Sequence, residues 1–335
     1  MRSVISAEQL QDMLNSWDVT GASVAVLNHG TVSVASAGLK DVETGDPVTD
    51  DTIFDAASLT KPLVSYAVLQ LVDSGVICLD EPLASFVRPV VADDARARKI
   101  TARHLLTHTA GLQNLRGADP PRLFFTPGSW FSYSSAGFMY LQMAIEAKTG
   151  EPLESTVRRL VFDPLEMHMS SLEWRESFVT NEAAPHEAGV RVACHRAPTA
   201  NASYSLKTTA TEYAAFLAAV LGGERLENQT WRDWLSPTVM IPRGAIIQLE
   251  GKPAAHESGI GWGLGWGLEP GFGSFFQWGK MSGMRAFVMG TAQANSGFVL
   301  FANCNTGLRL IQHLAEIVLP GQHPAIRLLL DEVTE

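Results

Sequence analysis

Residues 54–72 read FDAASLTKPLVSYAVLQLV and place Ser58 and Lys61 three positions apart at the start of an apolar segment. Pro62 limits where this segment can become helical, because proline lacks an N–H and is tolerated only in the first turn of a helix. The segment is therefore predicted to form a helix that begins near Ser58. Residues i and i+3 of a helix share a face, with Cβ atoms about 5–6 Å apart, so Ser58 and Lys61 are predicted to be in contact.

This pair has the chemistry that a nucleophilic hydroxyl requires. The N-terminus of a helix carries partial positive charge, which stabilises an alkoxide or an oxyanion. A neighbouring lysine whose pKa is lowered can accept the hydroxyl proton. A Ser-x-x-Lys match also arises by chance in a chain of 335 residues. The pattern therefore indicates catalysis only in combination with other segments.

Two further segments have a composition that suits a serine site. PGSWFSYSSAGF, residues 127–138, places Tyr133 on a loop rich in glycine, serine and proline ahead of a helix. QWGKMSGMRAF, residues 277–287, carries Gly279 and Gly283 within a strand pattern, which predicts the close approach of another backbone or of a ligand. A free N–H at this strand edge would complete an oxyanion hole with the N–H of Ser58. The alternatives are a tyrosine that only packs and an ordinary glycine bulge.

The rest of the chain predicts strands near both ends and helices in the middle. An amphipathic helix is expected at the N-terminus and is followed by a β-hairpin over residues 21–38 that turns at Asn28–Gly30. A helix from Thr211 ends at the glycines 222–223. Strands are expected over residues 275–291 and 296–305 and a closing helix over residues 308–319. This order favours an α/β domain interrupted by a helical one.

Composition limits the partners and the location of the protein. A net charge of −10 argues against nucleic acid as a partner and against a basic membrane-binding face. The chain has no run of about 18 apolar residues for a membrane span and no secretory signal pattern, so a cytoplasmic location is predicted. Cys78, Cys194 and Cys304 are interpreted as three reduced, buried thiols rather than as disulfide or metal ligands.

In this order, the segments resemble the serine β-lactamase and penicillin-binding-protein superfamily, and most closely the class C β-lactamase-like carboxylesterases of family VIII. DAASLTKPLVS is similar to the nucleophile segment of that family, and residues 127–150 are similar to its tyrosine loop and the following helix. Three other segments extend the resemblance over nearly the whole chain: ITARHLLTHTAGL (100–112), FDPLEMHMSSL (162–172) and GIGWGLGWGL (259–268).

The resemblance implies an α+β fold, in which an antiparallel sheet is flanked by helices on both faces and a mainly helical domain is inserted. We expect residues 1–78 and 205–335 to form the sheet domain and residues 79–204 to form the insertion, as one catalytic unit. The resemblance also implies that no metal and no cofactor is required.

The same resemblance implies roles for individual residues. Ser58 would be the nucleophile that forms an acyl-enzyme, Lys61 the base or a base-assisting cation, and Tyr133 the partner that relays a proton to the leaving group. The order in which Lys61 and Tyr133 accept the proton is left open. His104 and His108 are interpreted as structural.

Two motifs depart from the family pattern. Ser135 stands where the tyrosine motif carries asparagine, which would orient Lys61 and a substrate amide. The third motif, Lys-Thr-Gly or His-Thr-Gly in the family, has two possible registers here. In the register Trp278-Gly279-Lys280 the oxyanion N–H would come from Met281, and in the register Gln277-Trp278-Gly279 it would come from Lys280. Neither register keeps the cation that grips a substrate carboxylate, although Lys280 or Arg285 could replace it.

These departures favour a carboxylesterase that acts on a small, uncharged acyl compound over a β-lactamase or a DD-peptidase. The alternatives are an acyltransferase or amide hydrolase, and a non-catalytic binding protein that keeps the fold. Trp278 is predicted to line an apolar pocket, together with other aromatic residues if they face inward: Trp130, Phe131, Phe275 and Phe276. The expected partner is a small-molecule acyl substrate, with no nucleic acid and no membrane, and the oligomeric state is left open.

Overall fold

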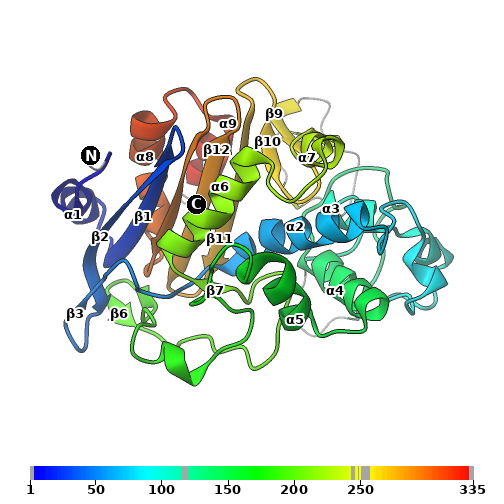
Figure 1. Ribbon diagram of the computed structural model, residues 1–335, viewed down its shortest axis with the longest axis horizontal. Helices are drawn as coiled ribbons and strands as arrows, with labels where there is room; N and C mark the ends of the chain where they lie inside the picture. The colour runs from blue at the N-terminus through cyan, green and yellow to red at the C-terminus, as the bar shows by residue number, and fades with distance from the viewer. Residues whose placement is uncertain (1–3, 115–119, 243–245, 248, 250–256, 332–335) are drawn as a thin grey trace.

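The computed structural model describes residues 4–114, 120–242, 246–247, 249 and 257–331. Its centre is a nine-stranded sheet in the order β3-β2-β1-β13-β12-β11-β10-β9-β8, and every pair of neighbours is antiparallel (Figure 1). The strands are β1 (Gly21–Asn28), β2 (Thr31–Asp41), β3 (Asp46–Pro47), β8 (Val239–Pro242), β9 (Glu257–Trp262), β10 (Gly267–Glu269), β11 (Ser274–Met281), β12 (Met284–Thr291) and β13 (Ser296–Ala302).

The sheet joins segments from opposite ends of the chain. β1 pairs with β13 from Ala22 opposite Ala302 to Asn28 opposite Ser296. β1 and β2 form the predicted hairpin, and its turn places His29 at φ 48° and Gly30 at φ 81°. Positive φ at both central residues gives a turn whose twist matches that of the strands. The strands predicted near the C-terminus are confirmed as β11, β12 and β13.

Helices cover both faces of this sheet. α1 (Ala7–Ser16), α8 (Ile311–Val318) and α9 (Pro324–Asp331) bury their apolar residues on one face. α2 (Thr60–Asp73) and α6 (Ala210–Gly222) pack on the other face, where α6 crosses β1 and β13 (Figure 1). The predicted fold class, an antiparallel sheet between helices, is therefore confirmed.

The chain between β3 and β8 carries most of the remaining helices. They are α3 (Ala102–Leu106), α4 (Ser135–Thr149), α5 (Leu153–Val157) and α7 (Asn228–Trp234), with two small sheets, β4 (Phe54–Asp55) with β7 (Lys207–Thr208) and β5 (His186–Glu187) with β6 (Val190–Arg191). The division of the chain at residues 78 and 204 stays a prediction.

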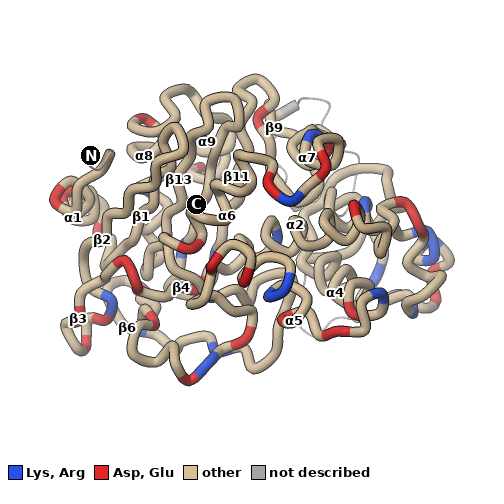
Figure 2. Tube along the Cα trace, viewed as in Figure 1, with Lys and Arg blue, Asp and Glu red and all other residues tan. Residues whose placement is uncertain are grey.

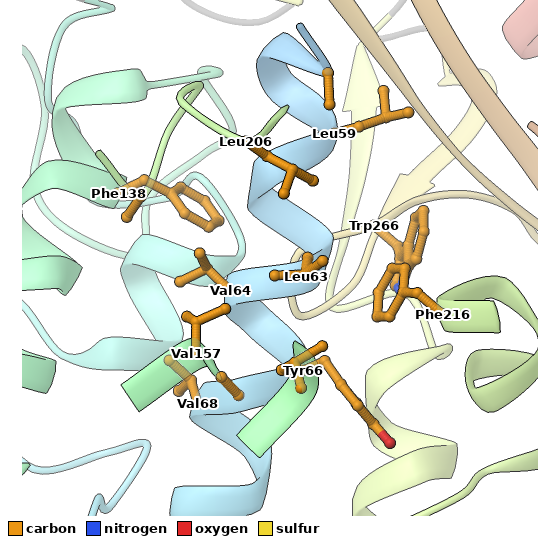
Figure 3. Packing of buried hydrophobic residues seen from close by; sticks show 14 of the residues in the cluster. Leu59, Leu63, Val64, Tyr66, Val68, Phe138, Val157, Leu206, Phe216 and Trp266 are labelled. Carbon is orange, nitrogen blue, oxygen red and sulfur yellow. The ribbon is translucent and has the colours of Figure 1, made fainter. Parts of the chain in front are cut away.

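Helix α2 begins where the proline argument placed it. A 3₁₀ turn, Ala57–Leu59, leads directly into α2. Every residue of α2 from Thr60 to Leu71 is buried, so tertiary packing holds this helix from all sides. Figure 3 shows Val64 and Val68 of α2 facing Phe138 and Val157.

The opposite side of α2 meets an aromatic layer. Tyr66 stacks on Trp234 with ring centroids 5.4 Å apart and meets Phe216 edge-on at 5.7 Å. Figure 3 shows Trp266 beside Phe216 in this layer. Because both sides of α2 are packed, the turn at its N-terminus is carried on a rigid support.

Strands β1 and β13 carry no charged residue (Figure 2). None of the described helices has both the length and the apolar character that crossing a membrane requires. One detail of the cysteine prediction is wrong. Only Cys304 is buried, because Cys78 lies exposed near the end of α2 and Cys194 lies half-buried in a loop.

Candidate active site

The turn that carries Ser58 is held in an unusual backbone conformation. Ala57, the residue before it, has φ 47°, a left-handed value that is uncommon outside glycine. Strand β11 lies directly against this turn, because a Cβ added to Gly279 would come within 2.5 Å of the carbonyl oxygen of Ala56. The close approach predicted for Gly279 is confirmed, and so is that of Gly283, which lies against the backbone of His186.

Lys61 lies beneath Ser58 and is 1% exposed. Its Nζ is 3.1 Å from Ser58 Oγ, 3.4 Å from Ser135 Oγ and 2.8 Å from the carbonyl oxygen of Ser203. Burial lowers the pKa of Lys61 to about 7, because an ammonium group loses hydration in the interior. Near neutral pH, therefore, a large fraction of the Lys61 side chain is a neutral amine.

Tyr133 reaches the same point from the loop before α4. Its backbone N–H donates to the carbonyl of Ile246 at 2.8 Å. Its phenol is in hydrogen-bonding contact with the Ser58 side chain and accepts a bond from Gln277 Nε2 at 2.9 Å. Burial raises the pKa of Tyr133, and the bonds to Ser58 and Gln277 oppose this only in part. Tyr133 is thus a neutral phenol at physiological pH.

The placement of Gln277 favours one register of the third motif. Its Nε2 lies against Tyr133 and within 3.3 Å of the Ser58 carbonyl oxygen. Gln277 therefore occupies the position beside the tyrosine, and Gly279 is the residue that lets β11 approach the nucleophile turn. This placement favours Gln277-Trp278-Gly279 over Trp278-Gly279-Lys280.

Ser135, which stands where the family pattern has asparagine, contacts Lys61 and is itself bonded to a second loop. Ser135 is the first residue of α4, and its hydroxyl lies close enough to contact Lys61 directly. The backbone N–H of Ser135 donates to Asn114 Oδ1 at 3.0 Å. No sequence pattern indicated Asn114, which lies in a separate loop.

Arg285 and Lys280, the two residues that could bind a substrate carboxylate, lie in different surroundings. Arg285 donates two 2.8 Å bonds to the carbonyl oxygens of Met281 and Met284, so its guanidinium is held on its own hairpin. Lys280 lies exposed near the end of β11. The position that faces Tyr133 carries the uncharged amide of Gln277.

An aromatic wall borders the phenol of Tyr133. Trp278 is 8% exposed, with its ring centroid 5.4 Å from that of Tyr133, and Trp262 lies 5.6 Å away. Phe131 and Phe276 pack against Trp262, whereas Trp130 packs against Phe125. Phe275 does not face this wall. It contacts Trp266 at 4.8 Å in the core on the other face, since neighbouring strand residues point to opposite faces.

His104 and His108 both support the loop that carries Tyr133. His104 forms a capping box with Thr101 at the start of α3. His108 accepts a bond from the Ser134 N–H at 3.1 Å, and its ring lies 4.3 Å from that of Tyr133. Burial, with a further contribution from Lys61, holds the pKa of His108 well below its usual value, so this imidazole is neutral.

A buried charge cluster lies on the other side of the nucleophile turn. Asp55 of β4 precedes Ser58 by three residues and pairs with Lys207 of β7 at 2.8 Å. Lys207 also contacts Glu182 at 2.7 Å, and all three side chains are 2–3% exposed. The sequence did not indicate this cluster, because its members are joined only by the β4–β7 ladder and by the neighbouring loop.

Known proteins share both the sequence pattern and the fold. The chain is 36% identical over 182 residues to esterase EstB of Burkholderia gladioli, which covers 44% of this chain and 46% of the relative. It is 31% identical over 180 residues to penicillin-binding protein 4 of Amycolatopsis lactamdurans, which covers 49% of this chain and 47% of the relative. The matched region thus spans about half the length of these relatives. A class C β-lactamase structure superposes with a TM-score of 0.77 at 19% identity, covering 94% of this chain and 95% of the other.

The family model described as Beta-lactamase matches residues 8–319. This range includes the nucleophile turn, the tyrosine loop and strand β11. The chain therefore belongs to the Beta-lactamase family.

Proposed function

We propose that this protein is a serine carboxylesterase that forms an acyl-enzyme on Ser58 and acts on small, uncharged acyl substrates. The observation that carries the proposal is the convergence of Ser58, Lys61 and Tyr133, with the uncharged amide of Gln277 beside the Tyr133 phenol. The similarity to an esterase over part of the chain supports ester hydrolysis over hydrolysis of a cyclic amide.

In the acylation step Ser58 Oγ attacks the ester carbonyl and its proton passes to the neutral amine of Lys61. The lowered pKa of Lys61 suits it to this role, whereas the raised pKa of Tyr133 suits a donor. The N–H groups of Ser58 and Lys280 are proposed to hold the oxyanion. When the intermediate collapses, the leaving alkoxide takes a proton from Tyr133, which regains one from Lys61, and an alcohol departs.

Deacylation runs through the same groups. Water attacks the acyl carbonyl, gives one proton to Lys61, and releases a carboxylic acid while Ser58 regains its proton. Transfer of the acyl group to an alcohol or amine differs only in the attacking nucleophile.

The charge of the preferred substrate follows from what surrounds Tyr133. Trp278 and Trp262 present apolar rings, and Gln277 is neutral. A substrate carboxylate buried here without a cation would lose hydration without compensation. We expect it to lower kcat/KM by about 10²-fold or more relative to a matched neutral ester.

The experiment is intact-protein mass spectrometry after incubation with a panel of neutral acyl esters, with Ser58→Ala as the control. The expected result is a mass increase equal to the acyl group on the parent and none on Ser58→Ala. Unchanged ester turnover by Ser58→Ala would reject the assignment. Added alcohols or amines would reveal transfer, and matched amides would reveal amide hydrolysis.

The same enzyme preparation tests the charge of the substrate. We expect short neutral esters to be cleaved readily and benzylpenicillin poorly. A parent that prefers a carboxylated ester would show that another group, such as Lys280, supplies the cation. The cytoplasmic location remains a prediction.

A further inference from the structure

The amide of Gln277 has only one orientation that its surroundings accept. Its Nε2 faces three oxygens, namely Tyr133 OH at 2.9 Å, the Ser58 carbonyl at 3.3 Å and its neighbour Trp278 carbonyl at 3.3 Å. Two of these are carbonyl oxygens, which can only accept. The reversed amide would place Oε1 against both of them, so the nitrogen must face the site.

This orientation leaves a buried acceptor unused. Gln277 is fully buried, and its Oε1 has no hydrogen-bond partner among the described residues. An unpaired buried acceptor is costly. Gln277 thus keeps its N–H directed at Tyr133 although its Oε1 is left unpaired.

The donation from Gln277 determines where the Tyr133 proton points. The phenol oxygen accepts from Nε2, so its own O–H must be directed to its other polar neighbour, Ser58 Oγ. Ser58 Oγ then accepts from Tyr133 and keeps its own proton available for Lys61, 3.1 Å away.

The number of N–H bonds on Lys61 determines how it bonds to Ser58. A neutral amine has two N–H bonds and one lone pair. In the neutral form, these two N–H bonds can go to the carbonyl of Ser203 at 2.8 Å and to the hydroxyl of Ser135 at 3.4 Å. The lone pair is left to face the Ser58 hydroxyl.

We propose that Gln277 is a positioning residue that sets the direction of a hydrogen-bond chain, from Gln277 N–H to the Tyr133 hydroxyl, from Tyr133 O–H to Ser58 Oγ, and from Ser58 O–H to Lys61 Nζ. This inference rests on the proposed function. In this chain Tyr133 enters acylation as a donor to the nascent alkoxide, while the Ser58 proton moves to Lys61. A cation beside the phenol would instead favour its ionisation.

The test is a double-mutant cycle between Gln277→Met and Tyr133→Phe, read as kcat/KM for a neutral p-nitrophenyl ester. Methionine matches glutamine in length but donates nothing. We expect Gln277→Met to lose about 10-fold and Tyr133→Phe about 10³-fold. Because Gln277 acts through Tyr133, the double variant should equal Tyr133→Phe. Independent, additive losses would overturn the proposal.

Two charged variants should change the rate and its pH profile in ways that would not be expected if Gln277 had only a structural role. With Gln277→Glu the ionised carboxylate attracts the Tyr133 proton away from Ser58, so we expect at least about 10²-fold loss at neutral pH. With Gln277→Lys a donor is kept but the phenol pKa falls, so an alkaline limb absent from the parent should appear in the pH profile. A Gln277→Glu enzyme faster than Gln277→Met would overturn the proposal.

Controls separate this inference from the proposed function. Circular dichroism identifies which variants fold, and the parent with Gln277→Met and Gln277→Glu ranks a donor, no group and an acceptor. Labelling of the parent at Ser58 by a fluorophosphonate tests the nucleophile itself. An unlabelled parent would reject the proposed function, whereas a labelled parent with an additive cycle would reject only the role of Gln277.

Discussion

Two lysines near the turn that carries Ser58 are almost equally buried, yet they are in opposite charge environments. Lys61 is 1% exposed and Lys207 is 2% exposed. Lys61 contacts two hydroxyls and one carbonyl, and burial lowers its pKa to about 7. Burial also lowers the pKa of Lys207, but Asp55 and Glu182 outweigh that effect and leave its pKa raised.

The difference shows what allows a buried lysine to be neutral. Burial alone penalises the ammonium form, and a carboxylate within ion-pair distance restores it. Lys61 has no such carboxylate among the ion pairs of the described residues, whereas Lys207 has two. Lys61 is therefore suited to receive a proton, and Lys207 is suited to hold Asp55 in place three residues before Ser58.

Replacing each lysine by methionine should separate chemistry from stability. We expect Lys61→Met to lower the rate of acyl-enzyme formation by about 10³-fold or more, because the base is removed. The free energy of unfolding should stay the same or rise, since a desolvated amine is replaced by an apolar group of similar length. Burst kinetics and urea denaturation measure the two quantities. A Lys61→Met protein that acylates at the parent rate would remove Lys61 from the mechanism.

Lys207→Met should lower the free energy of unfolding more than it lowers the rate of acyl-enzyme formation. It leaves two carboxylates buried without their shared cation, which costs about 3–5 kcal/mol of unfolding free energy. The loss should shrink as pH falls and the carboxylates become protonated. Adding Asp55→Asn to Lys207→Met removes one unpaired charge, so we expect it to recover part of the stability. A Lys207→Met protein as stable as the parent would mean that the cluster contributes little.

Local patterns predicted single elements and the contact between Ser58 and Lys61, whereas the fold class and the roles given to Ser58, Lys61 and Tyr133 rested on the resemblance of several segments to a known family. Pro62 fixed the start of α2, and the strand periodicity fixed β11 to β13. The contact between Asp55 and Lys207 could not be predicted, because 152 positions separate them and only the short β4–β7 ladder joins them.

One feature of the candidate site was left open by the sequence, and another was missed. The register of the third motif depends on which side of β11 faces Tyr133, and that is decided by how the strand packs on the nucleophile turn rather than by residue type. Lys61 is bonded to the backbone carbonyl of Ser203. Every residue has such a carbonyl, so the identity of residue 203 could not predict this contact.

The pH dependence of acylation tests the environment of Lys61 directly. The base acts in its neutral form, so kcat/KM for a neutral ester should fall about tenfold for each pH unit below about 7 and level off above it. The measurement is a pH profile on the parent, with Lys61→Met as the control that should lose this dependence. A rate that rises only above about pH 10, the range of an exposed lysine, would contradict the lowered pKa.

The smallest effect is expected at the rim of the Lys207 cluster. Arg196 pairs with Glu182 at 3.0 Å, but its side chain is 45% exposed and its guanidinium lies 4.5 Å from the Trp174 ring centroid. Water screens an exposed partner, so Arg196→Ala should cost about 1 kcal/mol or less in unfolding free energy. Added salt should reduce the difference further, and ester turnover should stay near that of the parent. If Arg196→Ala proved as damaging as Lys207→Met in the same denaturation experiment, the surface cation and not the buried lysine would be the one that neutralises Glu182.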